Sequence, residues 1–93
     1  MTKGNYDESI IEAVWRKSAP ERDYPSFRKD ICGASMQRGK YGETVKWGWE
    51  IDHIIPLSKG GSDSLWNMRP LHWENNRAKS DHSEGNWKCT IRE

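Results

Sequence analysis

Four polar residues stand at intervals that could assemble a site for hydrolytic chemistry: Asp52, His53, Asn67 and Asn76. Asp52 and His53 are neighbours in an expected strand, so their side chains should point to opposite faces of it. One of the two can then hold a metal ion while the other faces a substrate. Carboxylate and amide oxygens suit a hard cation such as Mg²⁺ or Mn²⁺, and a neutral imidazole can take a proton from water.

Each of these residues also has an ordinary structural role. An adjacent Asp-His pair usually marks a surface pair or a hydrogen bond at a strand end. The two asparagines alone would be a turn residue and a helix cap. The order and spacing of the whole set, rather than any single member, favour a site.

The local sequence predicts the elements that must position these residues. We expect a strand over residues 48–55, a Gly- and Ser-rich loop over 57–65, a second strand over 68–72 and a short helix over 73–79. The helix, the loop and the strand could together bring Asp52, His53 and Asn76 around one point.

The rest of the chain carries weaker signals. Residues 7–17 should form a helix whose apolar stripe contributes to the core, after a loose arm over residues 1–6. Residues 20–47 should be irregular because proline and glycine interrupt them, and residues 86–91 should add a terminal strand. No repeat or linker divides the chain, so we expect one α+β domain over residues 1–93.

Composition narrows the class of protein. The 15 basic and 14 acidic residues leave a net charge of +1, which does not indicate a strongly basic nucleic-acid module. A mean hydropathy of −1.06 leans towards disorder, whereas six tryptophans favour a small folded domain. We expect the tryptophans to anchor the core rather than to stack on bases.

The expected location and redox state of the protein follow from its lack of long apolar segments and from its two cysteines. No apolar run reaches the roughly 18 residues that a membrane span needs, and the N-terminus lacks the apolar segment of a secretory signal. Cys32 and Cys89 are the only cysteines, and we expect them to be free thiols in a reducing cytoplasm, with a single disulfide as the alternative.

Positive charge is concentrated locally in residues 28–46, where only two acidic residues oppose five basic ones. This segment is either a phosphate-contacting surface or a solvated loop, and the charge footprint favours the first interpretation. The candidate nucleic-acid-binding residues in this segment are Arg28, Lys29, Arg38, Lys40 and Lys46.

Three segments carry a family resemblance. Residues 51–63, IDHIIPLSKGGSD, resemble the first half of the HNH endonuclease motif. Residues 67–71, NMRPL, resemble its central segment, and residues 75–81, NNRAKSD, resemble its last helix. These sub-motifs agree in order and spacing over roughly a third of the chain. Residues 28–42 resemble, less specifically, the upstream part of small free-standing HNH proteins of bacteria and phages.

The resemblance implies a fold and a set of roles. The fold would be a ββα-metal finger over about residues 48–81, with two antiparallel strands, a loop and a helix around a divalent ion. His53 matches the general base that activates water, and Asp52 matches a metal ligand. Asn67 matches the residue that ties the loop down and orients the base through a backbone contact. Asn76 matches the second metal ligand, which is His in some members and Asn in others, so this is an H-N-N variant. Arg77 and Lys79 match basic helix positions near the path of the phosphates, which makes them further candidates for nucleic-acid binding.

The same resemblance implies a cofactor and a partner. The cofactor would be one divalent cation, Mg²⁺ or Mn²⁺, which Ni²⁺ or Zn²⁺ could replace in vitro. We expect a metal-dependent endonuclease that hydrolyses DNA and leaves a 5′ phosphate and a 3′ hydroxyl. Duplex DNA, read with low sequence specificity, is the expected partner, and the sequence indicates no membrane or protein partner. The alternatives are a non-cleaving DNA-binding module on the same scaffold and an RNase using the same site.

One departure from the family pattern concerns zinc. Many HNH proteins hold a structural Zn²⁺ with two Cys-x-x-Cys pairs. Here His72 and Asn75 stand where the second pair would be, and Cys32 has no partner two residues on. With Cys89 the chain offers three obvious ligands, and zinc needs about four. We therefore expect no structural zinc.

Overall fold

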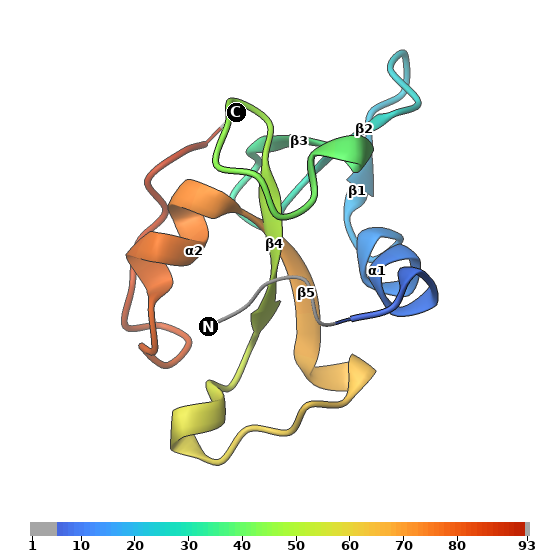
Figure 1. The fold of residues 1–93 in the computed structure, drawn as a ribbon. Coiled ribbons are helices and arrows are strands. Elements are labelled where there is room, and N and C mark those ends of the chain that lie inside the picture. The colour runs from blue at the N-terminus through green and yellow to red at the C-terminus, as the bar shows by residue number, and fades with distance from the viewer. Residues whose placement is uncertain (1–5, 93) are drawn as a thin grey trace.

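The computed structural model describes residues 6–92, in which two small antiparallel sheets and two helices form a mixed α+β fold (Figure 1). The fold class expected from the sequence is confirmed. No helix in the described part of the chain is long and apolar enough to cross a membrane. The elements are, in chain order, α1 (Glu8–Trp15), β1 (Ala19–Pro20), β2 (Phe27–Lys29), β3 (Ser35–Gln37), β4 (Trp49–His53), β5 (Met68–His72) and α2 (Trp73–Lys79).

Strands β4 and β5 pair over their full length and run in opposite directions. Trp49 lies opposite His72, and His53 at the other end lies opposite Met68. The bounds expected for β5 and α2 are confirmed, and β4 ends two residues before the expected strand end. The β4–β5–α2 unit is therefore the ββα arrangement that the resemblance implies.

The two helices lie on opposite sides of the β4–β5 pair (Figure 1). Trp49 and Ile51 pack in the apolar cluster with α1, whereas Glu50 and Asp52 contact side chains of α2. This division follows from the alternation of side chains along a strand. One face of the sheet is consequently apolar and the other is charged.

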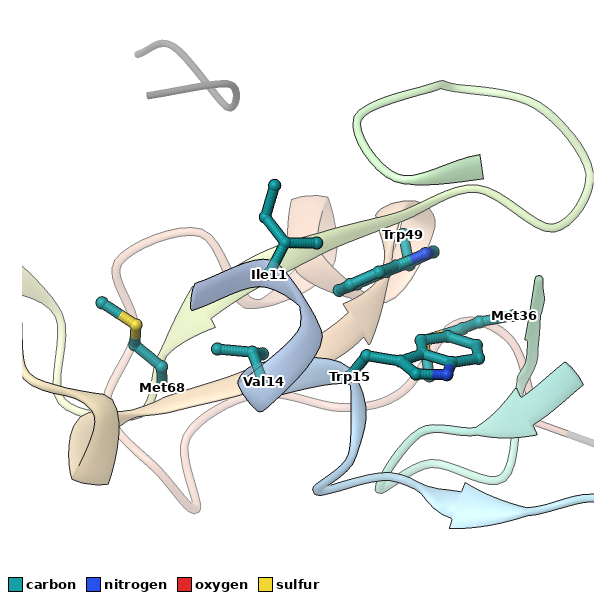
Figure 2. Close-up of a cluster of buried hydrophobic side chains, with 6 residues drawn as sticks. All are labelled: Ile11, Val14, Trp15, Met36, Trp49 and Met68. Atoms are coloured by element: carbon teal, nitrogen blue, oxygen red, sulfur yellow. The ribbon is translucent and has the colours of Figure 1, made fainter. Parts of the chain in front are cut away.

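The apolar cluster joins α1 to the sheets (Figure 2). Helix α1 begins where the Asp7 side chain accepts a hydrogen bond from the backbone N–H of Ile10, as expected for a helix cap. The rings of Trp15 and Trp49 lie 5.0 Å apart, so two of the six tryptophans are core anchors. The buried members of the cluster are Ile11, Val14, Trp15, Met36, Trp49 and Met68.

The expectation of a loose arm over residues 1–6 is wrong at its last residue. Tyr6 is half-buried and packs against the apolar cluster. Residues 1–5 lie outside the described part of the chain.

The expectation that residues 20–47 are irregular is also wrong, because β2 and β3 lie within this segment. These strands have three residues each, which is too short to leave an alternating pattern in the sequence. A buried side chain shapes the turn between them. Asp30 Oδ1 accepts hydrogen bonds from the backbone N–H groups of Cys32 and Ala34.

The expected terminal strand over residues 86–91 is not formed. The side chain of Asn75, which is fully buried, takes the place of a partner strand. Its Oδ1 accepts from the backbone N–H groups of Thr90 and Ile91, and its Nδ2 donates to the carbonyl of Ile91. The tail is thereby held along α2 without joining a sheet.

A disulfide joins Cys32 to Cys89 across 57 positions of the chain. The expectation of two free thiols is therefore wrong. Asn75 hydrogen-bonds both to Asp30, which precedes Cys32, and to Thr90, which follows Cys89. These contacts bring the two cysteines close together. Local sequence carries no signal for this contact, since it depends on where the tail is held.

We predict that replacing both cysteines by serine lowers the free energy of unfolding by about 2–4 kcal/mol, because the open chain regains the entropy of a long loop. Urea unfolding of the native protein and of the Cys32→Ser, Cys89→Ser variant measures the difference. Dithiothreitol supplies the control: it should lower the native midpoint to that of the variant and leave the variant unchanged. Equal midpoints without reductant would contradict the prediction.

Candidate active site

The carboxylate of Asp52 is buried between two cations. It is 4% exposed, its Oδ2 accepts from Arg69 Nε at 2.8 Å, and its Oδ1 lies 3.2 Å from Lys79 Nζ. Arg69 stands directly opposite Asp52 in the sheet register, and Lys79 comes from the last turn of α2. Burial raises the pKa of Asp52 above its usual value, and the two cations oppose that shift.

Both cations have further partners that hold them in place. Lys79, itself fully buried, donates from Nζ to the backbone carbonyl of His53 at 2.9 Å. Arg69 donates to both carboxylate oxygens of Glu84, at 3.0 and 2.8 Å. The hydrogen bond from Arg69 holds the pKa of Glu84 below its usual value. The charges around Asp52 are therefore compensated as a network.

The amide of Asn76 lies on the same charged face. Its Nδ2 donates to Glu50 Oε1 at 2.8 Å, and Arg77 donates to the other oxygen of Glu50 at 3.0 Å. Because the NH₂ group is directed at Glu50, the amide oxygen is the end of Asn76 left for another partner. Asp52 and Asn76 therefore both lie on the face of the β4–β5 pair that contacts α2. No group of three or more His, Cys, Asp or Glu within residues 6–92 could hold a metal ion.

His53 ends β4 and carries contacts that the sequence analysis did not assign. Its Nε2 lies 2.7 Å from Asp63 Oδ1 and 3.3 Å from the hydroxyl of Tyr6. The His53 side chain is 10% exposed, whereas that of Asp63 is 61% exposed. Asp63 lies within the motif quoted above, but nothing in the local sequence links it to Tyr6, which is 57 positions away.

Asn67 closes the loop that follows β4. Its side chain is buried and makes three hydrogen bonds: Oδ1 accepts from the N–H of Ile55, and Nδ2 donates to the carbonyls of Ile55 and Ser62. Its backbone carbonyl accepts a hydrogen bond from the N–H of Ile54, the residue after His53. A Cβ at Gly61 would lie 1.8 Å from the carbonyl of Ile55, so only glycine permits this closure.

Most of the candidate nucleic-acid-binding residues already have partners inside the chain. In the order of the sequence, Arg28 donates to the carbonyl of Ser18, Lys29 pairs with Glu21, Arg38 pairs with Glu8 and Glu12, Arg77 pairs with Glu50, and Lys79 pairs with Asp52. Lys46 is exposed and its Nζ lies 5.2 Å from the centre of the Trp47 ring. Among the described candidates, Lys40 and Lys46 are the two that take part in none of these ion pairs and carbonyl contacts.

Comparison with known proteins bears on this arrangement. The family model described as HNH endonuclease matches residues 41–82, a segment that contains β4, the closed loop, β5 and α2. No curated protein and no solved structure matches the chain. The match includes every residue that the motif assigns to a site, and the matched segment has the expected ββα order. The resemblance to the HNH endonuclease family that the sequence indicated is therefore confirmed for residues 41–82.

Proposed function

We propose that this protein is a divalent-cation-dependent endonuclease that hydrolyses phosphodiester bonds of DNA. The observation that carries the proposal is the placement of Asp52 and His53 at consecutive positions of β4, beside α2, within the segment that matches the HNH family. Consecutive positions of a strand direct the two side chains to opposite faces, so the cation ligand and the base can approach one phosphodiester from two sides. The match of residues 41–82 to the HNH family supports the nuclease class.

His53 is the proposed general base. A neutral imidazole can take a proton from water near physiological pH, and the resulting hydroxide attacks phosphorus. The backbone on both sides of His53 is held, by Lys79 at its own carbonyl and by Asn67 at the next N–H. These hydrogen bonds fix the backbone that carries the imidazole, and a general base needs a fixed position.

Asp52 and Asn76 are the proposed ligands of a hard divalent cation such as Mg²⁺ or Mn²⁺. The donors fit in type, since each is an oxygen, and Glu50 already orients the amide. The carboxylate keeps lone pairs beyond those that Arg69 and Lys79 engage. When bound, the cation would neutralise charge on the phosphate and stabilise the leaving 3′ oxygen.

The proposed DNA contact includes fewer basic residues than the sequence predicted. Lys40 and Lys46 can meet phosphates without giving up an ion pair, whereas Arg38 would have to leave Glu8 and Glu12. With a net charge of +1, the attraction to DNA must come from such local groups. We expect modest affinity and little sequence preference.

Plasmid cleavage with Mg²⁺, Mn²⁺, Ni²⁺ or EDTA, run side by side, tests the proposal. Nicked or linear product with a metal and none with EDTA would support it. Binding without product under every condition would favour the non-cleaving DNA-binding module instead. Faster digestion of labelled RNA than of DNA would favour the RNase.

We predict that His53→Ala lowers the cleavage rate by about 10²–10⁴-fold, which is the usual contribution of a general base. Circular dichroism and calorimetric titration with the metal should show a native fold and unchanged cation affinity. His82→Ala, which removes an exposed histidine outside the site, is the matched control and should cut normally. Cleavage by His53→Ala within a few-fold of the native rate would mean that His53 is not the base.

We predict that Asp52→Asn weakens cation binding more than Asn76→Ala does, because it removes the charged ligand of the pair. The asparagine keeps the shape of the side chain but removes the charge that compensates Arg69 and Lys79, so circular dichroism must first show that the variant is folded. Isothermal titration with Mn²⁺ measures both affinities, with Asp23→Asn as a matched control at an exposed position. Unchanged affinity in Asp52→Asn would refute its assignment as a ligand.

We predict that the Lys40→Ala, Lys46→Ala double variant flattens the dependence of log K on log salt by about 1.8, if each lysine neutralises one phosphate of duplex DNA. Fluorescence anisotropy across a salt series gives the slope. The control replaces two basic residues outside the proposed contact, Arg22 and Lys88, by alanine. An equal slope in native protein and double variant would place the DNA-binding surface elsewhere and leave the catalytic proposal standing.

A further inference from the structure

We propose that Asp63 positions the imidazole of His53, holding it in the tautomer with hydrogen on Nε2 so that Nδ1 carries the lone pair that receives the proton from water. This inference rests on the proposed function, because it concerns how the general base is oriented. Asp63 is a positioning residue: it acts through His53 and does not touch the substrate.

The contact itself determines the tautomer. Asp63 Oδ1 lies 2.7 Å from His53 Nε2. The hydrogen bond from His53, which has the larger effect, and the one from Tyr6 hold the pKa of Asp63 below its usual value. The Asp63 carboxylate is therefore ionised and can only accept hydrogen bonds. The ring nitrogen that faces this acceptor must carry the hydrogen. In a neutral ring the lone pair is then on Nδ1.

Tyr6 in turn fixes the carboxylate of Asp63. Its hydroxyl donates to the same oxygen, Asp63 Oδ1, at 2.8 Å. Burial and the hydrogen bond to Asp63 raise the pKa of Tyr6 to about 12, so the phenol keeps its hydrogen and remains a donor. Tyr6 is packed against the apolar cluster, and Asn67 fixes the carbonyl of Ser62, next to Asp63. An exposed carboxylate is thus fastened from two sides.

Folding stability gives little reason for this arrangement. A hydrogen-bonded pair with one largely exposed partner contributes little to the free energy of folding. Orientation of a catalytic group is different, since a misplacement of about 1 Å can cost about 10²-fold in rate. The geometry therefore assigns the contact to positioning.

Nuclear magnetic resonance can read the tautomer without metal or DNA. Long-range ¹H–¹⁵N correlations at a pH of about 8.5, where an ordinary imidazole is neutral, distinguish the two ring nitrogens of each of the three histidines. The spectrum of His53→Gln identifies the signals of His53. We expect hydrogen on Nε2 in the native protein, and a mixture of tautomers in Asp63→Ala. Asp63→Asn, whose amide oxygen accepts the same bond, should keep the native tautomer, as should the charge-matched control Asp23→Ala.

Kinetics then tests whether the orientation matters. Asp63→Ala should lower kcat about 10²-fold with KM changed by less than about twofold, and Asp63→Asn should restore most of the loss. In the His53→Ala background, Asp63→Ala should cost nothing further, because residues that act as a unit are not additive.

Three results would overturn the inference: a native His53 ring with hydrogen on Nδ1, a ring unchanged in Asp63→Ala, or a further loss of rate when Asp63→Ala is added to His53→Ala. If Asp63→Ala fails to fold, Asp63→Asn decides, since loss of the native tautomer there would also overturn it. A chain that cuts no nucleic acid would refute the proposed function, and the tautomer spectra would still decide whether Asp63 sets the ring.

Discussion

The burial of one carboxylate, that of Asp52, is the constraint on which the ββα unit depends. Taking an ionised carboxylate out of water costs several kcal/mol unless it is paired. Arg69 from β5 and Lys79 from α2 compensate the charge of Asp52. Because the two cations come from different elements, these ion pairs also fix the register of the sheet and the position of α2 against it. Glu84 extends the same network to the segment after α2.

A second buried carboxylate, that of Asp30, organises the other half of the molecule. Its Oδ2 accepts from the backbone N–H of His72 and from Asn75 Nδ2, which ties the β2–β3 turn to the junction of β5 and α2. Asn75 then holds the tail, and the Cys32–Cys89 disulfide closes it covalently. A chain with 33% hydrophobic residues has a small apolar core, and these polar and covalent contacts supplement it.

Residues that are near one another in the sequence could be predicted well. The strand over residues 68–72 and the helix over 73–79 are confirmed because their patterns are local and the loop before them is rich in glycine and serine. The three side-chain hydrogen bonds of Asn67 also join residues that are near one another in the motif. The strands β1 to β3 could not be predicted, because two or three residues are too few to show alternation.

The sequence by itself determined the family segment, the order of its elements and the identity of the residues proposed for the site. The tertiary structure alone decided which groups surround those residues. Arg69 and Lys79 face Asp52, and Asp63 and Tyr6 face His53, only because the sheet register and the packing of α1 bring distant segments together. Local patterns specify helices, strands and turns, but a hydrogen bond across 57 positions depends on the packing of every element between its partners.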